Sequence, residues 1–166
     1  MTDTTARPTA TKFGLWVLLA LVLLGLDQVT KFYFEHNFAL GESLPVFTGF
    51  NLVLAHNTGA AFSFLADAGG WQRWAFTGLA LAVIVAMLVL LARNNHRPLM
   101  ALALTLITAG AMGNMIDRAM YGYVVDFLDL YWQNWHWPAF NVADIAICGG
   151  AFFLILDELR SNRHTK

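Results

Sequence analysis

The clearest pattern along the chain is a pair of long runs without a formal charge. Trp74 to Ala92 and Pro98 to Ile116 are almost wholly apolar, and the short polar stretch 93–97 (RNNHR) separates them. A helix needs about 20 mostly apolar residues to cross a hydrocarbon core of roughly 30 Å. The pattern therefore predicts two membrane-spanning helices joined by a tight turn.

Two further segments also predict spans, although polar residues interrupt each of them. The run from Phe13 to Leu26 is short and follows basic residues, which is also typical of a cleaved signal peptide. No small-residue cleavage pattern follows it, and a helix can continue to Phe34, so we favour a span. The segment from Pro138 to Leu159 spans only if Asp144, near its start, lies shallow in the membrane or is buried in protein.

These segments predict an all-α membrane protein, a four-transmembrane-helix bundle with a small extracytoplasmic β platform and an interfacial segment. Two outer loops and one inner turn separate the spans. The predicted boundaries are 1–12 (tail), 13–34 (first span), 35–70 (outer loop), 71–92 (second span), 93–97 (turn), 98–118 (third span), 119–137 (outer loop), 138–159 (fourth span) and 160–166 (tail).

Basic residues gather on one side of the predicted membrane. The two tails and the inner turn hold seven of the ten lysines and arginines: Arg7, Lys12, Arg93, Arg97, Arg160, Arg163 and Lys166. Loops rich in Lys and Arg tend to stay in the cytoplasm. We therefore expect both termini inside and the two longer loops outside.

The outer loops are predicted to carry structure of their own. Residues 46–54 (VFTGFNLVL) are rich in β-branched and aromatic residues, which favours short strands. Residues 127–137 (FLDLYWQNWHW) mix aromatic and polar residues, which is typical of a segment at a membrane interface. Within it we expect Asp129 to be solvated. We also hypothesise that residues 60–70 move as a lid.

Composition narrows the class of protein further. Of the 166 residues, 58% are hydrophobic and 13% are charged, the mean hydropathy is +0.55 and the formal net charge is −1. Soluble domains carry roughly 25% charged residues. These values exclude a disordered tail and a nucleic-acid binder that relies on bulk positive charge. The single cysteine, Cys148, excludes an internal disulfide framework.

Polar residues from three predicted spans and one outer loop share one depth, just below the outer surface. They are Asp27, Lys31, Asn114, Asp117, Arg118, Asp126, Asn141 and Asp144. A charge at the centre of a membrane helix costs roughly 2.5–3.5 kcal/mol on the insertion scale, so such residues indicate a functional site. A structural explanation stays open for Asp27 and Lys31, as a helical ion pair. For Asp117 we favour a structural role, as part of an interfacial charge pair with Arg118 that anchors the third span. Arg118 could instead bind a lipid phosphate or a substrate carbonyl.

Asp126 and Asp144 suggest a particular chemistry because each lies close to apolar neighbours. Two carboxylates brought together at low dielectric cannot both ionise cheaply, so one keeps a proton. This state suits an aspartyl hydrolase. Its ionised member activates water, and its protonated member donates to the scissile carbonyl oxygen and then to the leaving amine. The same pair could hold a divalent ion, although no further ligands are evident.

Other chemistries have weaker support. Ser63 lacks a nucleophile elbow and a base, Cys148 lies within the predicted fourth span, and the five histidines show no metal-ligand spacing. Asp157 and Glu158, at the inner end, are expected to form a solvated face. Four glycines are expected to form close helix contacts rather than nucleotide loops: Gly110, Gly113, Gly149 and Gly150.

Five short motifs follow one another along the chain. They are 27–31 (DQVTK), 57–63 (NTGAAFS), 110–118 (GAMGNMIDR), 124–127 (VVDF) and 140–144 (FNVAD). Over nearly the whole chain, this series resembles the bacterial lipoprotein signal peptidase family, also called signal peptidase II. One departure is alanine at position 111, where many members have a second glycine, and alanine is also small.

The resemblance implies an aspartyl intramembrane endopeptidase of the bacterial cytoplasmic (inner) membrane, without a metal or cofactor. Its implied catalytic pair is Asp126 and Asp144. The residues implied to bind substrate or support the site are Asn57, Asn114, Arg118, Asn141, Asp27, Lys31, Gly110 and Val124.

The resemblance also implies partners. The implied substrate is a diacylglyceryl-modified prolipoprotein, cut on the N-terminal side of its lipidated cysteine among membrane phospholipids, and globomycin-type peptides would inhibit the reaction. Two other classes stay open on the residues alone: a proton-coupled transporter and a non-catalytic assembly factor that binds signal peptides. Transporter sites tend to lie at the membrane midplane and at internal repeats, whereas this polar cluster is one-sided and no repeat is visible.

Overall fold

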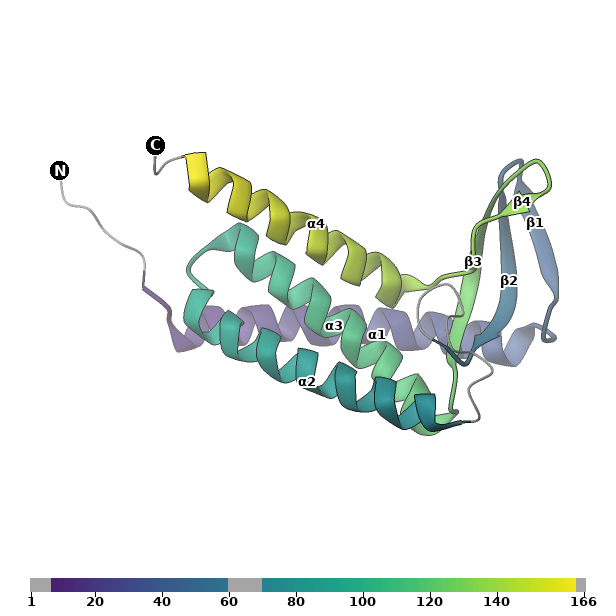
Figure 1. Ribbon diagram of the computed structural model, residues 1–166, viewed down its shortest axis with the longest axis horizontal. Coiled ribbons are helices and arrows are strands. Elements are labelled where there is room, and N and C mark those ends of the chain that lie inside the picture. The colour runs from purple at the N-terminus through teal and green to yellow at the C-terminus, as the bar shows by residue number, and fades with distance from the viewer. Residues whose placement is uncertain (1–6, 60–69, 164–166) are drawn as a thin grey trace.

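The computed structural model describes residues 7–59 and 70–163 of the chain. In this part of the chain, long helices lie side by side and a small sheet stands at one end of them (Figure 1). The hypothesised lid lies, except for Gly70, outside the described residues. In chain order the elements are α1 (Ala10–Asn37), β1 (Ser43–Phe47), β2 (Phe50–Asn57), α2 (Trp71–Asn94), α3 (Pro98–Met120), β3 (Val124–Trp132), β4 (Trp135–His136) and α4 (Val142–Arg163).

α1 extends three residues beyond each end of the predicted span. It begins after Thr9, whose hydroxyl accepts a hydrogen bond from the backbone N–H of Lys12 at 3.2 Å. Its 28 residues measure about 42 Å at the helical rise, which exceeds the roughly 30 Å of a hydrocarbon core. The last turns of α1 therefore reach the sheet, where Phe34 stacks on Phe127 of β3 with ring centroids 4.4 Å apart.

Within the described residues, three helices are long and apolar enough to cross a membrane, namely α1, α2 and α3. Their most apolar windows have mean hydropathies of 1.9, 2.7 and 1.7. α4 is not among them, in keeping with the polar residues near both of its ends. The chain is thus a mostly helical membrane protein with a small antiparallel sheet.

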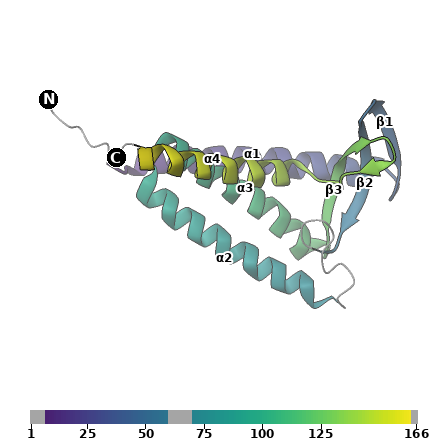
Figure 2. The ribbon, with the colours of Figure 1, turned by 45° about the horizontal axis from the view of Figure 1, so that its top comes forward.

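α3 is the central helix. It packs against α1, α2 and α4, and Figure 2 shows it between α2 and the other two helices. Small residues permit this packing. A Cβ atom on Gly110 would collide with the backbone oxygen of Ala143 on α4, and one on Gly150 would lie 2.6 Å from the Ile107 side chain. The close contacts predicted for these glycines, and for Gly113 against α1, are confirmed.

The sheet has the order β1-β2-β3-β4, with antiparallel neighbours throughout. Beneath it, Phe34 of α1 packs with Leu54, Val125 and Phe127 in a small core. The strands expected within residues 46–54 are confirmed as parts of β1 and β2. The 127–137 segment, expected to lie at the membrane interface, contains most of β3 and all of β4, which were not predicted from the sequence. Alternating aromatic and polar residues suit the two faces of a strand as well as an interface.

Asp129 is buried rather than solvated, so that expectation is wrong. Its side chain, on β3, accepts hydrogen bonds from Asn51 Nδ2 at 2.8 Å and from His136 Nδ1 at 2.9 Å. These bonds connect β2, β3 and β4. A carboxylate with two such partners can be buried at a tolerable cost.

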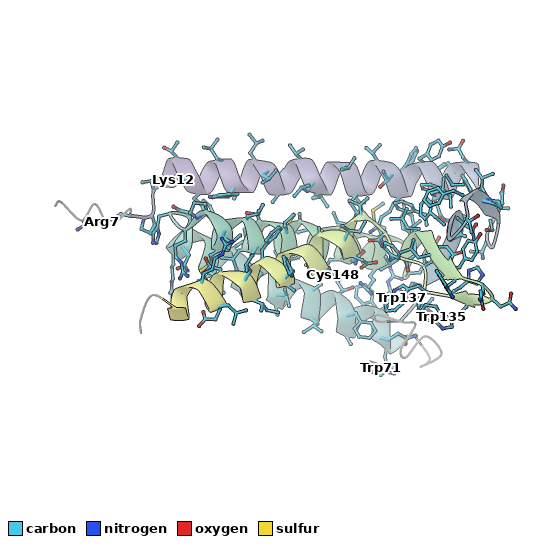
Figure 3. The ribbon with its side chains drawn as sticks, turned by 90° about the horizontal axis from the view of Figure 1, so that it is seen from above. Arg7, Lys12, Trp71, Trp135, Trp137 and Cys148 are labelled. Carbon is cyan, nitrogen blue, oxygen red and sulfur yellow. The ribbon has the colours of Figure 1, made fainter. Side chains whose placement is uncertain are left out.

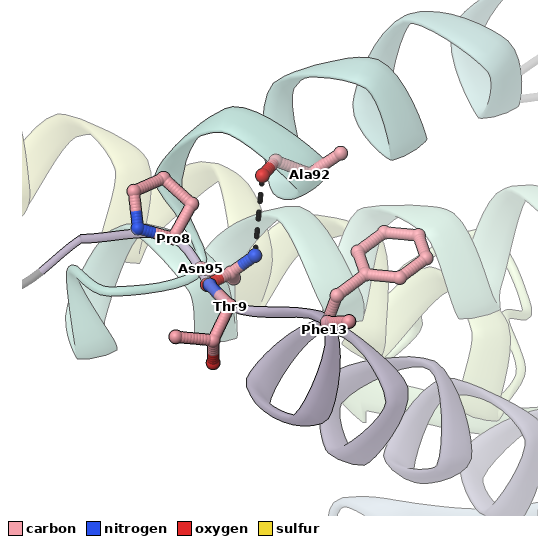
Figure 4. Close-up of a pocket in the computed structure, with 6 residues that line it drawn as sticks. Pro8, Thr9, Phe13, Ala92 and Asn95 are labelled. Carbon is pink, nitrogen blue, oxygen red and sulfur yellow. Dashed lines mark hydrogen bonds between the residues drawn. The ribbon is translucent and has the colours of Figure 1, made fainter.

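Polar contacts also join the helices at the end opposite the sheet. Asn95, in the turn between α2 and α3, accepts a hydrogen bond from Thr9 N at 2.9 Å on its side chain and one from Trp16 Nε1 at 3.2 Å on its backbone oxygen. Arg97 pairs with Asp157 of α4, whose side chain is 15% exposed. The solvated face expected at Asp157 and Glu158 is therefore confirmed for Glu158, which is exposed, and only in part for Asp157. An open pocket of about 270 Å³ lies here (Figure 4), lined by Pro8, Thr9, Ala10, Phe13, Ala92 and Asn95.

Gly149 differs from the other three glycines, because a Cβ atom there would meet nothing within 4 Å. The close contact predicted for Gly149 is therefore wrong.

The adjacent glycines Gly149 and Gly150 provide a matched test of this packing. We expect Gly150→Ala to destabilise the protein by roughly 1–3 kcal/mol through overpacking, and Gly149→Ala to be neutral or slightly stabilising. Thermal unfolding in detergent, followed by tryptophan fluorescence, measures both. Equal melting temperatures would contradict the tight contact between α3 and α4.

Candidate active site

Asp126 is the third residue of β3 and is buried beneath neighbouring polar side chains. Only 2% of its surface is exposed. One carboxylate oxygen accepts a hydrogen bond from Asn141 Nδ2 at 2.7 Å, and the other accepts one from Asn57 Nδ2 at 3.1 Å. Asn57 ends β2, the strand that pairs with β3. The sheet therefore places Asp126 and one of its donors together.

Asp144 lies in the first turn of α4, where it forms a reciprocal cap with Asn141. The backbone N–H of Asp144 donates to Asn141 Oδ1 at 2.9 Å, and the backbone N–H of Asn141 donates to Asp144 Oδ2 at 3.3 Å. Asn114 of α3 adds a third donor, with its Nδ2 2.8 Å from Asp144 Oδ1. The positive end of the α4 dipole also points toward this carboxylate.

Asn141 thus connects the two aspartates, since its amide nitrogen contacts Asp126 and its oxygen and backbone N–H contact Asp144. It is fully buried. Residues from a strand and a helix, distant in sequence, meet at this point. The structure thus brings together residues that were expected from the sequence to converge.

A buried lysine supports the cluster from the α1 side. Lys31 Nζ lies 3.0 Å from Asp27 Oδ2, 2.9 Å from Asp117 Oδ2 and 2.9 Å from Asn114 Oδ1. The i,i+4 pair considered from the sequence is therefore present, with Asp117 as a second acidic partner. Gln28 Nε2 bridges the two acids, at 3.3 Å from Asp27 and 3.0 Å from Asp117.

Each acidic partner of Lys31 also holds the backbone next to a site aspartate. Asp27 Oδ1 accepts a hydrogen bond from the N–H of Ala143 at 2.8 Å, and Asp117 Oδ2 accepts one from the N–H of Val125 at 3.1 Å. Ala143 precedes Asp144, and Val125 precedes Asp126. One ion cluster therefore positions both chain segments that carry the pair.

Arg118 borders the site on the α3 side. Its Nη2 donates to Gly59 O at 3.0 Å, its Nη1 donates to Asn114 O at 3.3 Å, and its guanidinium lies over the Phe76 ring at 5.5 Å. The two site aspartates are close enough to attract its charge. Its Nε is buried and has no hydrogen-bond partner among the residues described.

The surroundings of Asp126 shift its pKa. Burial, and next the negative charge of Asp144, raise the pKa of Asp126 from 3.8 to about 7. Hydrogen bonds from Asn57 and Asn141, together with the charge of Lys31, lower it. Asp126 therefore retains its proton near neutral pH much more readily than an ordinary aspartate does.

The other predicted positions lie around this cluster. Val124, also buried, faces Asn57 across the β2–β3 pair, and Gly110 permits the approach of the Ala143 backbone. Ser63 lies outside the described residues, and Cys148 is exposed on α4. Among the described residues, no three His, Cys, Asp or Glu side chains are grouped so that they could hold a metal ion.

One polar group near the site was missed from the sequence. Glu35 of α1 contacts His56 and Tyr123, which adjoin Asn57 and Val124. A signal was available, because Glu35 continues the i,i+4 stripe of Asp27 and Lys31 along α1. Its partners His56 and Tyr123 lie far from Glu35 in the sequence, so no regular spacing predicts their contact with it.

Comparison with known proteins identifies the family to which the chain belongs. A sequence model described as signal peptidase (SPase) II matches residues 19–160. The chain therefore belongs to the signal peptidase II family and is a peptidase of the aspartic type.

Close relatives and solved structures agree with this assignment. Lipoprotein signal peptidases from Ralstonia nicotianae and Paraburkholderia phymatum are 56% and 49% identical to it, over 90% and 98% of this chain and 87% and 98% of theirs. A bacterial membrane enzyme solved by the in meso method matches with a TM-score of 0.85 at 27% identity, covering 98% of this chain and 96% of the other. A second such structure gives 0.75, also at 27% identity, covering 93% and 97%.

The Lys31 cluster leads to a stability prediction. Lys31→Met leaves two buried carboxylates without their counter-charge, so we expect a loss of roughly 3–5 kcal/mol in unfolding free energy. Lys12→Met, at an exposed position on the same helix, is the matched control. Unfolding in detergent measures both variants, and equal stability of the two would contradict a supporting role for Lys31.

Proposed function

We propose that Asp126 and Asp144 are the catalytic pair of this peptidase. The observation that carries the proposal is their shared contact with Asn141, which donates to Asp126 and caps α4 together with Asp144. An aspartic peptidase needs two carboxylates near enough to hold one proton between them. The proximity of these two, in the VVDF and FNVAD motifs, supports that role.

The two carboxylates are proposed to differ in protonation at rest. Asp126, with its pKa raised to about 7, is the protonated member. Asp144 accepts hydrogen bonds from Asn114 Nδ2 and from the N–H of Asn141 at the first turn of α4. Such donors and the helix dipole stabilise a negative charge, so Asp144 is the ionised member.

This division assigns each proton transfer. Asp144 takes a proton from the attacking water, while Asp126 gives its proton to the carbonyl oxygen of the scissile bond, which becomes a hydroxyl in the tetrahedral intermediate. When the intermediate collapses, the C–N bond breaks and the leaving nitrogen takes the proton from Asp144. Asp126 recovers its proton from the hydroxyl, and the pair returns to its starting state.

The inferred substrate is a diacylglyceryl-modified prolipoprotein, cut on the N-terminal side of its lipidated cysteine. This inference rests on the relatives, which are named lipoprotein signal peptidases. A signal peptide is itself an apolar helix, so its end would reach the level of Lys31 and Asn114. Arg118 Nε is suited to donate to a substrate carbonyl there. Globomycin-type peptides are inferred to occupy the same place.

The proposed topology has four spans in the bacterial cytoplasmic membrane, with α4 as the fourth. Asp144, at its start, is partly buried against Asn114 and Asn141, which lowers the cost of bringing a carboxylate to this depth. Figure 3 shows Arg7 and Lys12 at one end of the bundle and Trp71, Trp135 and Trp137 toward the other. Basic residues favour the cytoplasmic side, and tryptophan favours the interface. The termini are therefore proposed to be cytoplasmic, with the site on the outer side.

Removing either carboxylate tests the catalytic pair. Asp126→Asn and Asp144→Asn are expected to lower the cleavage rate of a lipidated prolipoprotein in detergent by at least roughly 1000-fold, because each removes a proton-transfer group. Glu42→Gln, which likewise replaces a carboxylate by an amide but at an exposed position outside the pair, is expected to cut at nearly the wild-type rate. Undiminished cleavage by either folded pair variant would overturn the proposal.

The pKa of Asp126 leads to a prediction about pH. Because Asp126 acts in its protonated form, kcat/KM is expected to fall as the pH rises through about 7. Asn57→Ala removes a hydrogen bond that lowers this pKa, so the fall should move to higher pH. A pH profile of each protein measures the shift. A fall that stays in place, or moves to lower pH, would contradict the assignment of the acid to Asp126.

A further inference from the structure

Three polar side chains outside the proposed catalytic pair form a closed group where α1 meets the sheet. Glu35 Oε2 lies 2.9 Å from His56 Nε2, and Glu35 Oε1 accepts a hydrogen bond from Tyr123 OH at 2.9 Å. The rings of His56 and Tyr123 stack, with centroids 3.8 Å apart and an interplanar angle of 16°. Each residue contacts the other two.

The group stands between the Lys31 cluster and the sheet. Glu35 is one helical turn beyond Lys31 on α1. His56 directly precedes Asn57 on β2, and Tyr123 directly precedes Val124, the cross-strand partner of Asn57. Glu35 therefore contacts both chain segments that meet at Asn57.

We propose that Glu35, His56 and Tyr123 are positioning residues that hold Asn57 against Asp126. This inference rests on the proposed function, since it concerns the geometry of the proposed acid. Asn57 Nδ2 reaches Asp126 across 3.1 Å from the end of its strand. Pairing with Val124 and a hydrogen bond from Gly59 N to Asn57 Oδ1 at 3.0 Å already hold this strand end, and the contact of Glu35 with both flanking segments restrains it further.

The chemistry of the three side chains favours persistent hydrogen bonds from His56 and Tyr123 to Glu35. A carboxylate only accepts hydrogen bonds, so both His56 Nε2 and Tyr123 OH donate to Glu35. Burial, and then the hydrogen bond to Glu35, raise the pKa of Tyr123 to about 12, so its hydroxyl remains a donor at every working pH. About a fifth of the Glu35 and His56 side chains is exposed, at 21% and 23%. Most of the pair is thus shielded from water.

Loosening this group has a predictable electrostatic effect on Asp126. The charges that act on Asp126 come from Asp144 on α4, Lys31 on α1 and Arg118 on α3. None of the three contacts Glu35, His56 or Tyr123 in the hydrogen bonds and ion pairs of the described residues, so we expect them to stay in place. Only the hydrogen bond from Asn57 is weakened, and that bond lowers the pKa of Asp126. The fall of kcat/KM with pH should then move to higher pH, in the direction expected for Asn57→Ala.

The experiment compares purified full-length variants on a lipidated prolipoprotein in detergent. We expect Glu35→Ala to lower kcat by roughly 10-fold, a scale typical of a small misplacement of a reacting group, with KM nearly unchanged and the pH fall moved upward. Glu35→Gln should recover part of the loss because its amide can still hydrogen-bond. Tyr123→Phe, which keeps the ring, should give a smaller loss. Glu42→Gln, at an exposed glutamate in the same outer region, should match the wild type.

Two results would separate this inference from the proposed function. Wild-type kcat and pH profile in Glu35→Ala, with the expected loss of cleavage in Asp126→Asn and Asp144→Asn, would overturn the positioning role alone. Undiminished cleavage by either of the two folded aspartate variants would overturn the proposed function. If Glu35→Ala does not fold, Glu35→Gln and Tyr123→Phe decide, because an unshifted pH profile in both would also overturn the inference.

Discussion

The site depends on one buried ammonium group. Lys31 has three N–H donors, and in this structure they face Asp27, Asp117 and Asn114. Burying these charges is costly unless they are paired and their remaining lone pairs are used. Asp27 and Asp117 also accept hydrogen bonds from the backbone N–H groups of the residues that precede Asp144 and Asp126, respectively. The arrangement that makes the charges tolerable therefore also sets where the two aspartates lie.

The same cluster favours an asymmetric pair. Lys31 donates to the oxygen of the Asn114 amide, so its nitrogen is directed to Asp144. Asp126 receives two amide donors but is more deeply buried, and it lies in the field of Asp144. A protein that must keep one of two similar acids protonated achieves this through their surroundings.

Much of the fold follows from local patterns, whereas the details depend on distant partners. Long uncharged runs identified α2 and α3, because apolar length is a property of the local sequence. The run in α1 is shorter, and its prediction needed the further argument that the helix continues past Asp27 and Lys31. β3 was missed, since its aromatic and polar alternation suits an interface as well as a strand. Asp129 was misjudged because its partners, Asn51 and His136, lie on other strands. The polar convergence was predictable from helix direction, but the contacts of Asn141 depend on a side-chain geometry that no spacing encodes.

The central claim is that the proton at rest belongs to Asp126. Infrared spectroscopy of the purified protein at a pH of about 6 tests it directly, because a protonated carboxyl group buried away from water has its own C=O stretching band. We expect this band in the wild type, its loss in Asp126→Asn and its persistence in Asp144→Asn. Loss of the band in Asp144→Asn with persistence in Asp126→Asn would contradict the claim.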